Sequence, residues 1–136
     1  MANPSRCKRS KYRNQRCEFN GIPFDSKAER ERYIQLKVLE SAGEIAHLQY
    51  HCCVVTLTDV GLTYKPDFTY RENNIDIYED VKGVETDRWK IIKKLWRGYG
   101  LSILRVAKPI YSKSGIRFKI QDIQGKEIIP DGDKQG

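Results

Sequence analysis

The stretch Lys65–Gly83, KPDFTYRENNIDIYEDVKG, decides the fold and the chemistry that we expect of this chain. The segments Leu62–Tyr70 and Ile75–Lys82 are rich in the β-branched and aromatic residues that are typical of strands. Asn73-Asn74 lies between them as a two-residue connection. The stretch therefore predicts a β-hairpin.

The register of this hairpin places two carboxylates opposite each other. With a loop at residues 73–74, position 72 pairs with 75, so paired residue numbers sum to 147 and Asp67 pairs with Asp80. Their Cβ atoms then lie about 5 Å apart. Strand parity puts Lys82 on the same face, one pleat further along. The opposite face carries Glu79 and the apolar residues Pro66, Phe68, Tyr70, Ile75, Ile77 and Val81. A longer loop would shift this register.

Two opposed carboxylates and a nearby lysine indicate metal-assisted hydrolysis. Like charges facing each other destabilise a sheet unless something binds between them, and a divalent cation would do so. All-oxygen ligands suit Mg²⁺ or Mn²⁺ rather than zinc. Lys82 would help to orient and deprotonate an attacking water, or stabilise charge that develops on a phosphate. The pattern predicts a phosphodiester-hydrolysis site.

Working outward from the hairpin, the remaining chain predicts one α/β domain. Ser26-x-x-Glu29 matches a capping box at the start of a helix that Gly43 ends. The other expected elements are a hairpin over Gln15–Phe24 around Asn20-Gly21, a strand over His51–Thr58, a helix over Asp87–Tyr99, and strands over Leu101–Ala107 and Ile116–Ile123. This order predicts a mixed central sheet flanked by helices within residues 15–130, preceded by a flexible arm at 1–14 and followed by a frayed tail at 131–136. Trp89 and Trp96, two helical turns apart, are expected in the core or in a dimer interface.

The charge of the chain is concentrated near its N-terminus. The 136 residues include 25 Lys and Arg against 18 Asp and Glu, a formal charge of +7. Residues 1–17 hold six basic residues and no acid, which leaves a near-neutral body of 19 basic against 18 acidic residues. A basic segment of this kind favours DNA binding. The expected DNA contacts are Arg6, Lys8, Arg9, Lys11, Arg13 and Arg16, with Lys90, Lys93 and Lys94 on the second helix. For those last three, an ordinary solvated helix face is an equal alternative.

The four cysteines give no clear metal site. His47 and His51 lie near Cys52 and Cys53, but no Cys-x-x-Cys pair exists, so we expect buried, reduced thiols rather than zinc ligands. No apolar run approaches the length of a membrane helix, and no apolar segment follows the basic N-terminus as in a secretory signal. We therefore expect a cytoplasmic protein that does not associate with membranes.

Around these residues the chain resembles the PD-(D/E)XK nuclease superfamily. Pro66-Asp67 matches the first half of that motif, and Asp80-Val81-Lys82 matches the second half. The segment 24–29, FDSKAE, resembles the opening helix of small phage-encoded nucleases of this superfamily. The layout is also similar to that of Holliday-junction resolvases of the archaeal type, over residues 11–107.

The resemblance implies a restriction-endonuclease-like core and a role for each motif residue. Asp67, Asp80 and the Val81 carbonyl would hold Mg²⁺ or Mn²⁺, and Lys82 would be the catalytic lysine. Glu29 would approach the metal directly or through water, although the capping box gives it an equally plausible role as a helix cap. The resemblance further implies a homodimer that cuts four-way DNA junctions, in the host cytoplasm if the protein is phage-encoded.

Two other functions stay open on the sequence alone. One is a nuclease of the same fold that acts on flaps, single strands or duplex sites. The other is a basic, non-catalytic DNA-binding protein, which leaves the opposition of Asp67 and Asp80 unexplained and therefore ranks last.

Overall fold

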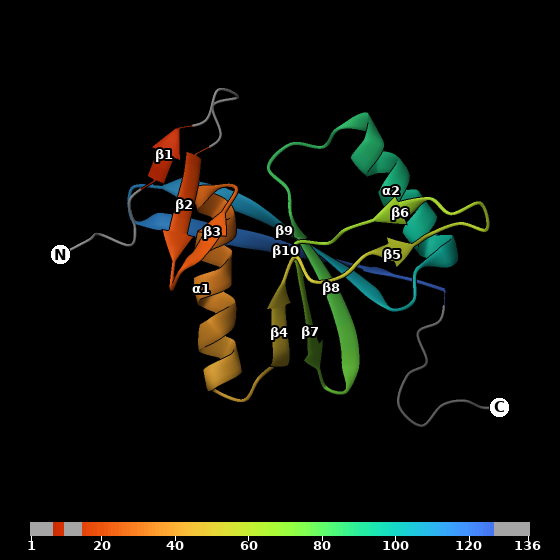
Figure 1. The fold of residues 1–136 in the computed structure, drawn as a ribbon, viewed down its shortest axis with the longest axis horizontal. Coiled ribbons are helices and arrows are strands. Elements are labelled where there is room, and N and C mark those ends of the chain that lie inside the picture. Colours follow the sequence, from red (N-terminus) through yellow and green to blue (C-terminus); the bar gives the residue numbers. More distant parts are fainter. Residues whose placement is uncertain (1–6, 10–14, 127–136) are drawn as a thin grey trace.

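The structure, a computed structural model, describes residues 7–9 and 15–126 and has a mixed β-sheet at its centre (Figure 1). The central sheet has the strand order β10-β9-β8-β7-β4, in which β8 and β9 are parallel and the other neighbours are antiparallel. Its strands are β4 (Ala46–Tyr50), β7 (Phe68–Glu72), β8 (Ile75–Val81), β9 (Ile103–Ser112) and β10 (Gly115–Gln124). The helices are α1 (Lys27–Ser41) and α2 (Asp87–Tyr99). The predicted α/β class with a mixed sheet and two helices is confirmed.

Two small sheets lie beside this core (Figure 1). One contains β1 (Cys7–Arg9), β2 (Gln15–Phe19) and β3 (Ile22–Phe24), and the other contains β5 (Val55–Thr56) and β6 (Thr63–Tyr64). Strands β2 and β3 form the predicted hairpin, with Asn20 and Gly21 both at positive φ. The three-stranded sheet contacts α1, so it covers the N-terminal side of that helix.

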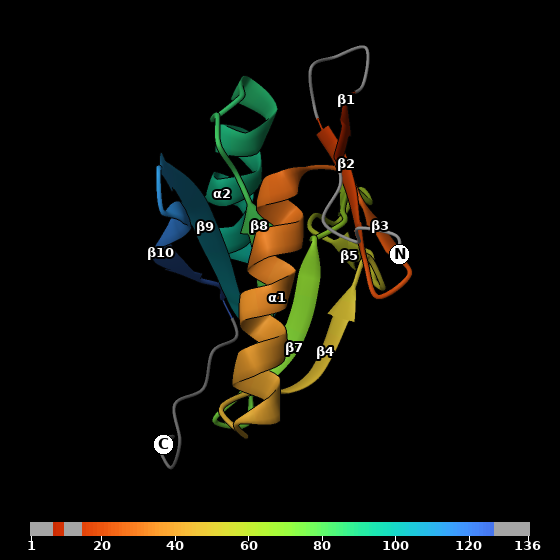
Figure 2. The ribbon, with the colours of Figure 1, turned by 90° about the vertical axis from the view of Figure 1, so that its left-hand side faces the viewer.

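The two helices pack on opposite faces of the central sheet (Figure 2), and side-chain parity along β8 explains why. Ile77 belongs to the core cluster that contains Tyr33 and Leu36 of α1, whereas the next residue, Tyr78, packs against the cluster of α2. Successive side chains of a strand point to opposite faces, so one strand serves both cores. Trp89 and Trp96 are buried in the α2 cluster, which confirms the expectation of a core position for them.

A buried ion pair fixes α1 to the sheet. Arg32 donates two hydrogen bonds to the Glu79 carboxylate, from Nε at 2.6 Å and from Nη2 at 3.1 Å. Tyr70 donates a third to Glu79 Oε1 at 2.5 Å. Glu79 is fully buried on the core face, where the hairpin register predicted it. These bonds replace the water that both charges lose on burial.

Three predictions about the strands are wrong in detail. The strand expected at His51–Thr58 lies upstream as β4, because the chain turns at His51, whose φ is 54°, and resumes only as the short β5. The strand expected at Leu62–Tyr70 is interrupted between β6 and β7 by the segment 65–67, which contains Pro66. Proline lacks the N–H that a sheet ladder needs. Strand β9 extends to Ser112, well beyond the predicted end at Ala107.

The N-terminal arm and the cysteines also differ from expectation. Residues 7–9, which fall inside the predicted irregular arm, form β1 and pair with β2, with Cys7 opposite Cys17 in register. Cys17 is disulfide-bonded, and Cys52 and Cys53 are joined to each other, so the expectation of reduced thiols is wrong. Cys52 is exposed rather than buried. The rest of the predicted arm and the predicted tail at 131–136 lie outside the described residues.

The Arg32–Glu79 pair gives a test of the fold. Arg32→Ala leaves Glu79 buried without its main partner, so we expect the free energy of unfolding to fall by about 3–5 kcal/mol in urea denaturation. The double variant Arg32→Met, Glu79→Leu removes both charges and should regain most of that loss. A double variant as unstable as the single one would contradict this account.

Candidate active site

The hairpin turn brings Asp67 and Asp80 together as predicted. Asn73 and Asn74 have φ angles of 52° and 65°, and the pairing of Phe68 with Glu79 gives the register sum of 147. Asp67 therefore stands opposite Asp80, directly before β7 begins. Two hydrogen bonds fix the pair, because the Asp67 amide donates to Asp80 Oδ1 at 3.2 Å and the Val81 amide donates to Asp67 Oδ2 at 2.9 Å.

Lys82 lies next to this pair, immediately after β8 ends. Its Nζ is 3.0 Å from Asp80 Oδ2 and 4.9 Å from the ring centroid of Trp89 on α2. The Lys82 side chain keeps about a third of its surface exposed, whereas that of Asp80 is almost completely buried. The ammonium group therefore stands at the border between the buried carboxylate and solvent.

Glu29 joins the site from α1. Ser26 caps the helix by accepting a hydrogen bond from the Glu29 amide at 3.1 Å, so the backbone of Glu29 takes part in the predicted cap. The carboxylate of Glu29 points away from the cap, and its Oε1 accepts a hydrogen bond from the Tyr50 hydroxyl at 2.7 Å. The same oxygen lies 4.0 Å from His51 Nε2. The carboxylate of Glu29 therefore faces Tyr50 and His51 rather than the start of the helix, and its role as a metal ligand stays a prediction.

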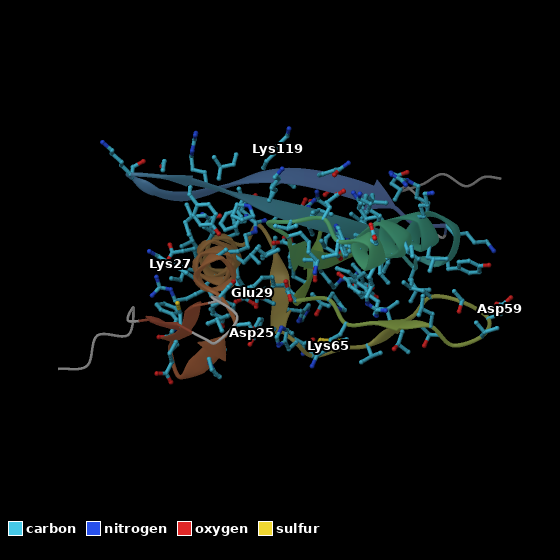
Figure 3. All side chains as sticks on the ribbon, turned by 90° about the horizontal axis from the view of Figure 1, so that it is seen from above. Asp25, Lys27, Glu29, Asp59, Lys65 and Lys119 are labelled. Carbon is cyan, nitrogen blue, oxygen red and sulfur yellow. A yellow bond between two sulfur atoms is a disulfide. The ribbon has the colours of Figure 1, made fainter. Side chains whose placement is uncertain are left out.

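His51 is the site residue that the sequence analysis did not identify. Its Nε2 lies 3.5 Å from Asp67 Oδ1, and its ring stacks on Tyr50 with centroids 3.8 Å apart. One ligand atom each from Asp25, Glu29 and His51 lie within 4.8 Å of one another (Figure 3 labels Asp25 and Glu29). The sequence interpretation placed His51 at the start of a strand and considered it only as a zinc ligand beside Cys52 and Cys53.

Burial and crowding shape the electrostatics of the carboxylates. Burial raises the pKa of Glu29 to about 7, and the negative charge of Asp67 adds to that effect against the Tyr50 hydrogen bond. Burial likewise raises the pKa of Asp80 to about 7, again with a contribution from Asp67 and with opposition from Lys82. The hydrogen bond to Asp67 raises the pKa of His51. The site therefore holds more negative charge than its own cations compensate.

The donor set fits a divalent cation. The ligand atoms that lie within 4.8 Å of one another come from Asp25, Glu29 and His51, and Asp67 adjoins this group 3.5 Å from His51. Carboxylate oxygens of this kind suit Mg²⁺ and Mn²⁺, and Asp80 lies on the far side of Asp67. A cation there would favour the ionised forms of Glu29 and Asp80, whose raised pKa values reflect unfavourable charge. Val81 adjoins Asp80 at the end of β8, and the role of its carbonyl as a ligand stays a prediction.

The predicted DNA-binding residues lie on two elements. Lys90 and Lys94 are exposed on α2, and Lys93 pairs with Glu85 at the start of that helix. Arg6, Lys11 and Arg13 fall outside the described residues, while Lys8 and Arg9 belong to β1 and Arg16 to β2. A cavity of about 440 Å³ adjoins Lys82, and its lining includes Lys108 and Lys119 of the β9–β10 hairpin, two lysines that the sequence analysis did not select.

These observations define an α/β protein with a cluster of three carboxylates, a histidine and a lysine at one end of a mixed sheet. Residues 9–113 match the family described as "Protein of unknown function (DUF1064)", and the chain belongs to this family. The match includes every residue of the cluster. No curated protein and no solved structure matches the chain. Within the described residues, neither helix is long and apolar enough to span a membrane.

The raised pKa values predict how the stability of the metal-free protein depends on pH. Glu29 and Asp80 have folded-state pKa values near 7, above their ordinary values of 4.5 and 3.8, so the folded state binds more protons in that window. Their contribution to stability is present below about pH 4 and is lost as the pH rises through 7. Asp80→Asn should therefore raise the free energy of unfolding at pH 8 by roughly 2 kcal/mol. The free energy of unfolding of this variant should also fall less steeply than that of the wild type as the pH rises from about 4 through 7.

Thermal unfolding with and without Mg²⁺ checks this prediction. Mg²⁺ should raise the melting temperature of the wild type at pH 8 and leave that of Asp80→Asn nearly unchanged. Asp76→Asn is the matched control, because Asp76 lies on the same strand but is exposed and paired with Arg71. Equal responses of the two variants to pH and Mg²⁺ would refute the assignment of the metal to Asp80.

Proposed function

We propose that this protein is a Mg²⁺- or Mn²⁺-dependent DNA endonuclease of the PD-(D/E)XK type. The observation that carries the proposal is the opposition of Asp67 and Asp80 across the hairpin, with Lys82 Nζ 3.0 Å from Asp80. A mixed sheet with a helix on each face is compatible with the core expected of such a nuclease. The roles of the residues follow from their positions in this cluster.

Each side chain has a definite task in phosphodiester hydrolysis. Asp67, Asp80 and Glu29 would hold the cation, which when bound supplies Lewis-acid stabilisation of the charge on the phosphate. Lys82 stands at the solvent border, where its ammonium group can orient the attacking water and stabilise the negative charge of the phosphorane-like transition state. In the metal-free protein His51 lies against Asp67, where its protonated ring lowers the repulsion between the carboxylates.

The substrate that we propose is branched DNA, cut by a homodimer at a four-way junction. Lysines extend the positive surface beyond the site, with Lys108 and Lys119 along the cavity beside Lys82 and with Lys90 and Lys94 on α2. Lysines of this kind contact phosphates without reading sequence, as recognition of a junction by its shape requires. The basic residues near the N-terminus would add further salt-sensitive affinity.

Cleavage of a labelled four-way junction in Mg²⁺ tests the proposal. Lys82→Ala and Asp80→Asn should each lower the single-turnover rate at saturating DNA by at least about a hundredfold, because each removes a group that stabilises the transition state. Asp76→Asn and Lys37→Gln serve as controls, since both residues lie in exposed ion pairs away from the cluster. Wild-type rates in Lys82→Ala and Asp80→Asn would refute the mechanism.

Mapping the cuts distinguishes the substrates. Symmetric paired nicks in opposing strands would support a dimeric junction resolvase, whereas cleavage of flaps, single strands or linear duplex at equal salt would assign a different DNA substrate to the same site. Binding without any product in Mg²⁺ or Mn²⁺ would indicate a non-catalytic DNA-binding protein.

Replacing Mg²⁺ by Ca²⁺ should preserve binding of the DNA junction but not its cleavage. Ca²⁺ accepts more ligands at longer distances than Mg²⁺, so it should occupy the carboxylates without organising the reaction. We therefore expect junction binding in Ca²⁺ to equal that in Mg²⁺, with a cleavage rate lower by at least about a hundredfold. Turnover in Ca²⁺ at the Mg²⁺ rate would contradict the proposed site.

A further inference from the structure

A second basic cavity lies against a different face of α1 from the one that carries Glu29. It measures about 380 Å³ and lies between the first turns of α1 and the tip of the β9–β10 hairpin. Figure 3 shows Lys27 and Glu29 leaving α1 on different sides. Its lining includes Lys27, Arg30, Glu31, Tyr111 and Lys113.

Arg30 is the unusual residue of this cavity. It is 96% buried, with a relative exposure of 4%, although guanidinium groups are rarely buried without partners. Its Nη2 pairs with Glu31 Oε2 at 2.6 Å. Its Nε and Nη1 are buried and have no hydrogen-bond partner in the described part of the chain. Leaving such donors unpaired is unfavourable, so the arrangement calls for an acceptor that residues 7–9 and 15–126 do not supply.

The charge and shape of the cavity select an anion with several oxygens. Lys27, Arg30 and Lys113 contribute three positive charges against one negative charge from Glu31. Lys27 and Lys113 are exposed at the rim, and neither forms an ion pair within residues 7–9 and 15–126. The planar guanidinium fork matches the oxygens of a phosphate group, with which it can form two parallel hydrogen bonds.

We propose that this cavity binds a backbone phosphate of the DNA strand whose cleavage we assign to the carboxylate site, an inference that rests on the proposed function. Glu29 and Arg30 are consecutive residues of α1 and thus point about 100° apart around the helix axis. Two directions 100° apart on a helix of about 10 Å diameter end roughly 8 Å from each other. A strand that rises about 3.4 Å per nucleotide covers that separation in two to three nucleotides.

The exposed ring of Tyr111 also favours a DNA strand as the ligand of this cavity. It is 68% exposed at the edge of the cavity, where its ring offers a face on which an unpaired base can stack. A phosphate held by Arg30, Lys27 and Lys113 would thus fix the strand about two to three nucleotides from the scissile bond. Arg30 is a positioning residue in this scheme, since it contacts the substrate away from the reacting atoms.

NMR of the arginine side chains tests the occupant directly in metal-free protein, where no cleavage occurs. The Nε–Hε signal of Arg30 is assigned from its disappearance in Arg30→Lys, a variant that keeps the buried charge. Titration with a four-way junction should shift this signal in proportion to DNA binding. A shift with inorganic phosphate or a nucleoside monophosphate but none with DNA would overturn the proposal, because the cavity would then serve a free phosphate compound.

Affinity measurements on rim variants provide the second test. Lys27→Gln and Lys113→Gln should each weaken binding of a fluorescent junction by roughly three- to tenfold and lower the salt slope by about 1. Lys37→Gln, on the same helix but paired with Glu40, is the control and should change neither value. The cleavage rate at saturating DNA should stay at the wild-type level in Lys37→Gln.

The outcomes separate this inference from the proposed nuclease activity. An unmoved Arg30 signal together with unchanged affinity of both rim variants overturns the phosphate site, whether or not the protein cleaves DNA. A shifted signal and weakened rim variants in a protein that cleaves nothing would support the phosphate site and refute the nuclease proposal alone.

Discussion

The register of the β7–β8 hairpin is the constraint on which the rest of the structure depends. Because side chains alternate along a strand, a slip of one residue would send Asp80 to the core face and Glu79 to the site. Asn73 and Asn74, both at positive φ, fix the loop at two residues and so fix the opposition of Asp67 and Asp80. The same register gives Glu79 its buried position opposite Phe68, within reach of α1.

Helix α1 links the parts of the molecule because its successive residues face different surroundings. Glu29 reaches the carboxylate site, Arg30 lines the basic cavity, and Arg32 pairs with Glu79 in the core. The Arg32–Glu79 pair is fully enclosed and therefore holds the helix in one position along the sheet. Together with the packing of Tyr33 and Leu36 in the same core, this pair sets the placement of Glu29 and Arg30.

The carboxylate site combines favourable geometry with unfavourable charge. Asp80 is almost fully buried, and Lys82 and the Asp67 amide compensate its charge in part. Such an arrangement lowers the stability of the metal-free protein at neutral pH, as the pKa values of about 7 for Asp80 and Glu29 show. A bound cation would remove this disadvantage, so ligand binding and folding stability are expected to be coupled.

The sequence by itself determined the features that depend on local chemistry. The Asn73-Asn74 loop, the Ser26 cap and the spacing of Trp89 and Trp96 each act over a few residues, so their outcomes followed from pattern alone. The opposition of Asp67 and Asp80 belongs with them, because a two-residue loop fixes every pair of a hairpin.

Only the tertiary structure decided which distant residues meet. His51 enters the site because β4 lies beside β7, a pairing that no local pattern encodes. The cavity around Arg30 requires the β9–β10 hairpin to extend past its predicted end and reach α1. The disulfide between Cys52 and Cys53 likewise depends on the turn that follows β4, where the sequence pattern favoured a strand. Contacts of this kind depend on packing between elements, which periodicity and spacing along one chain do not specify.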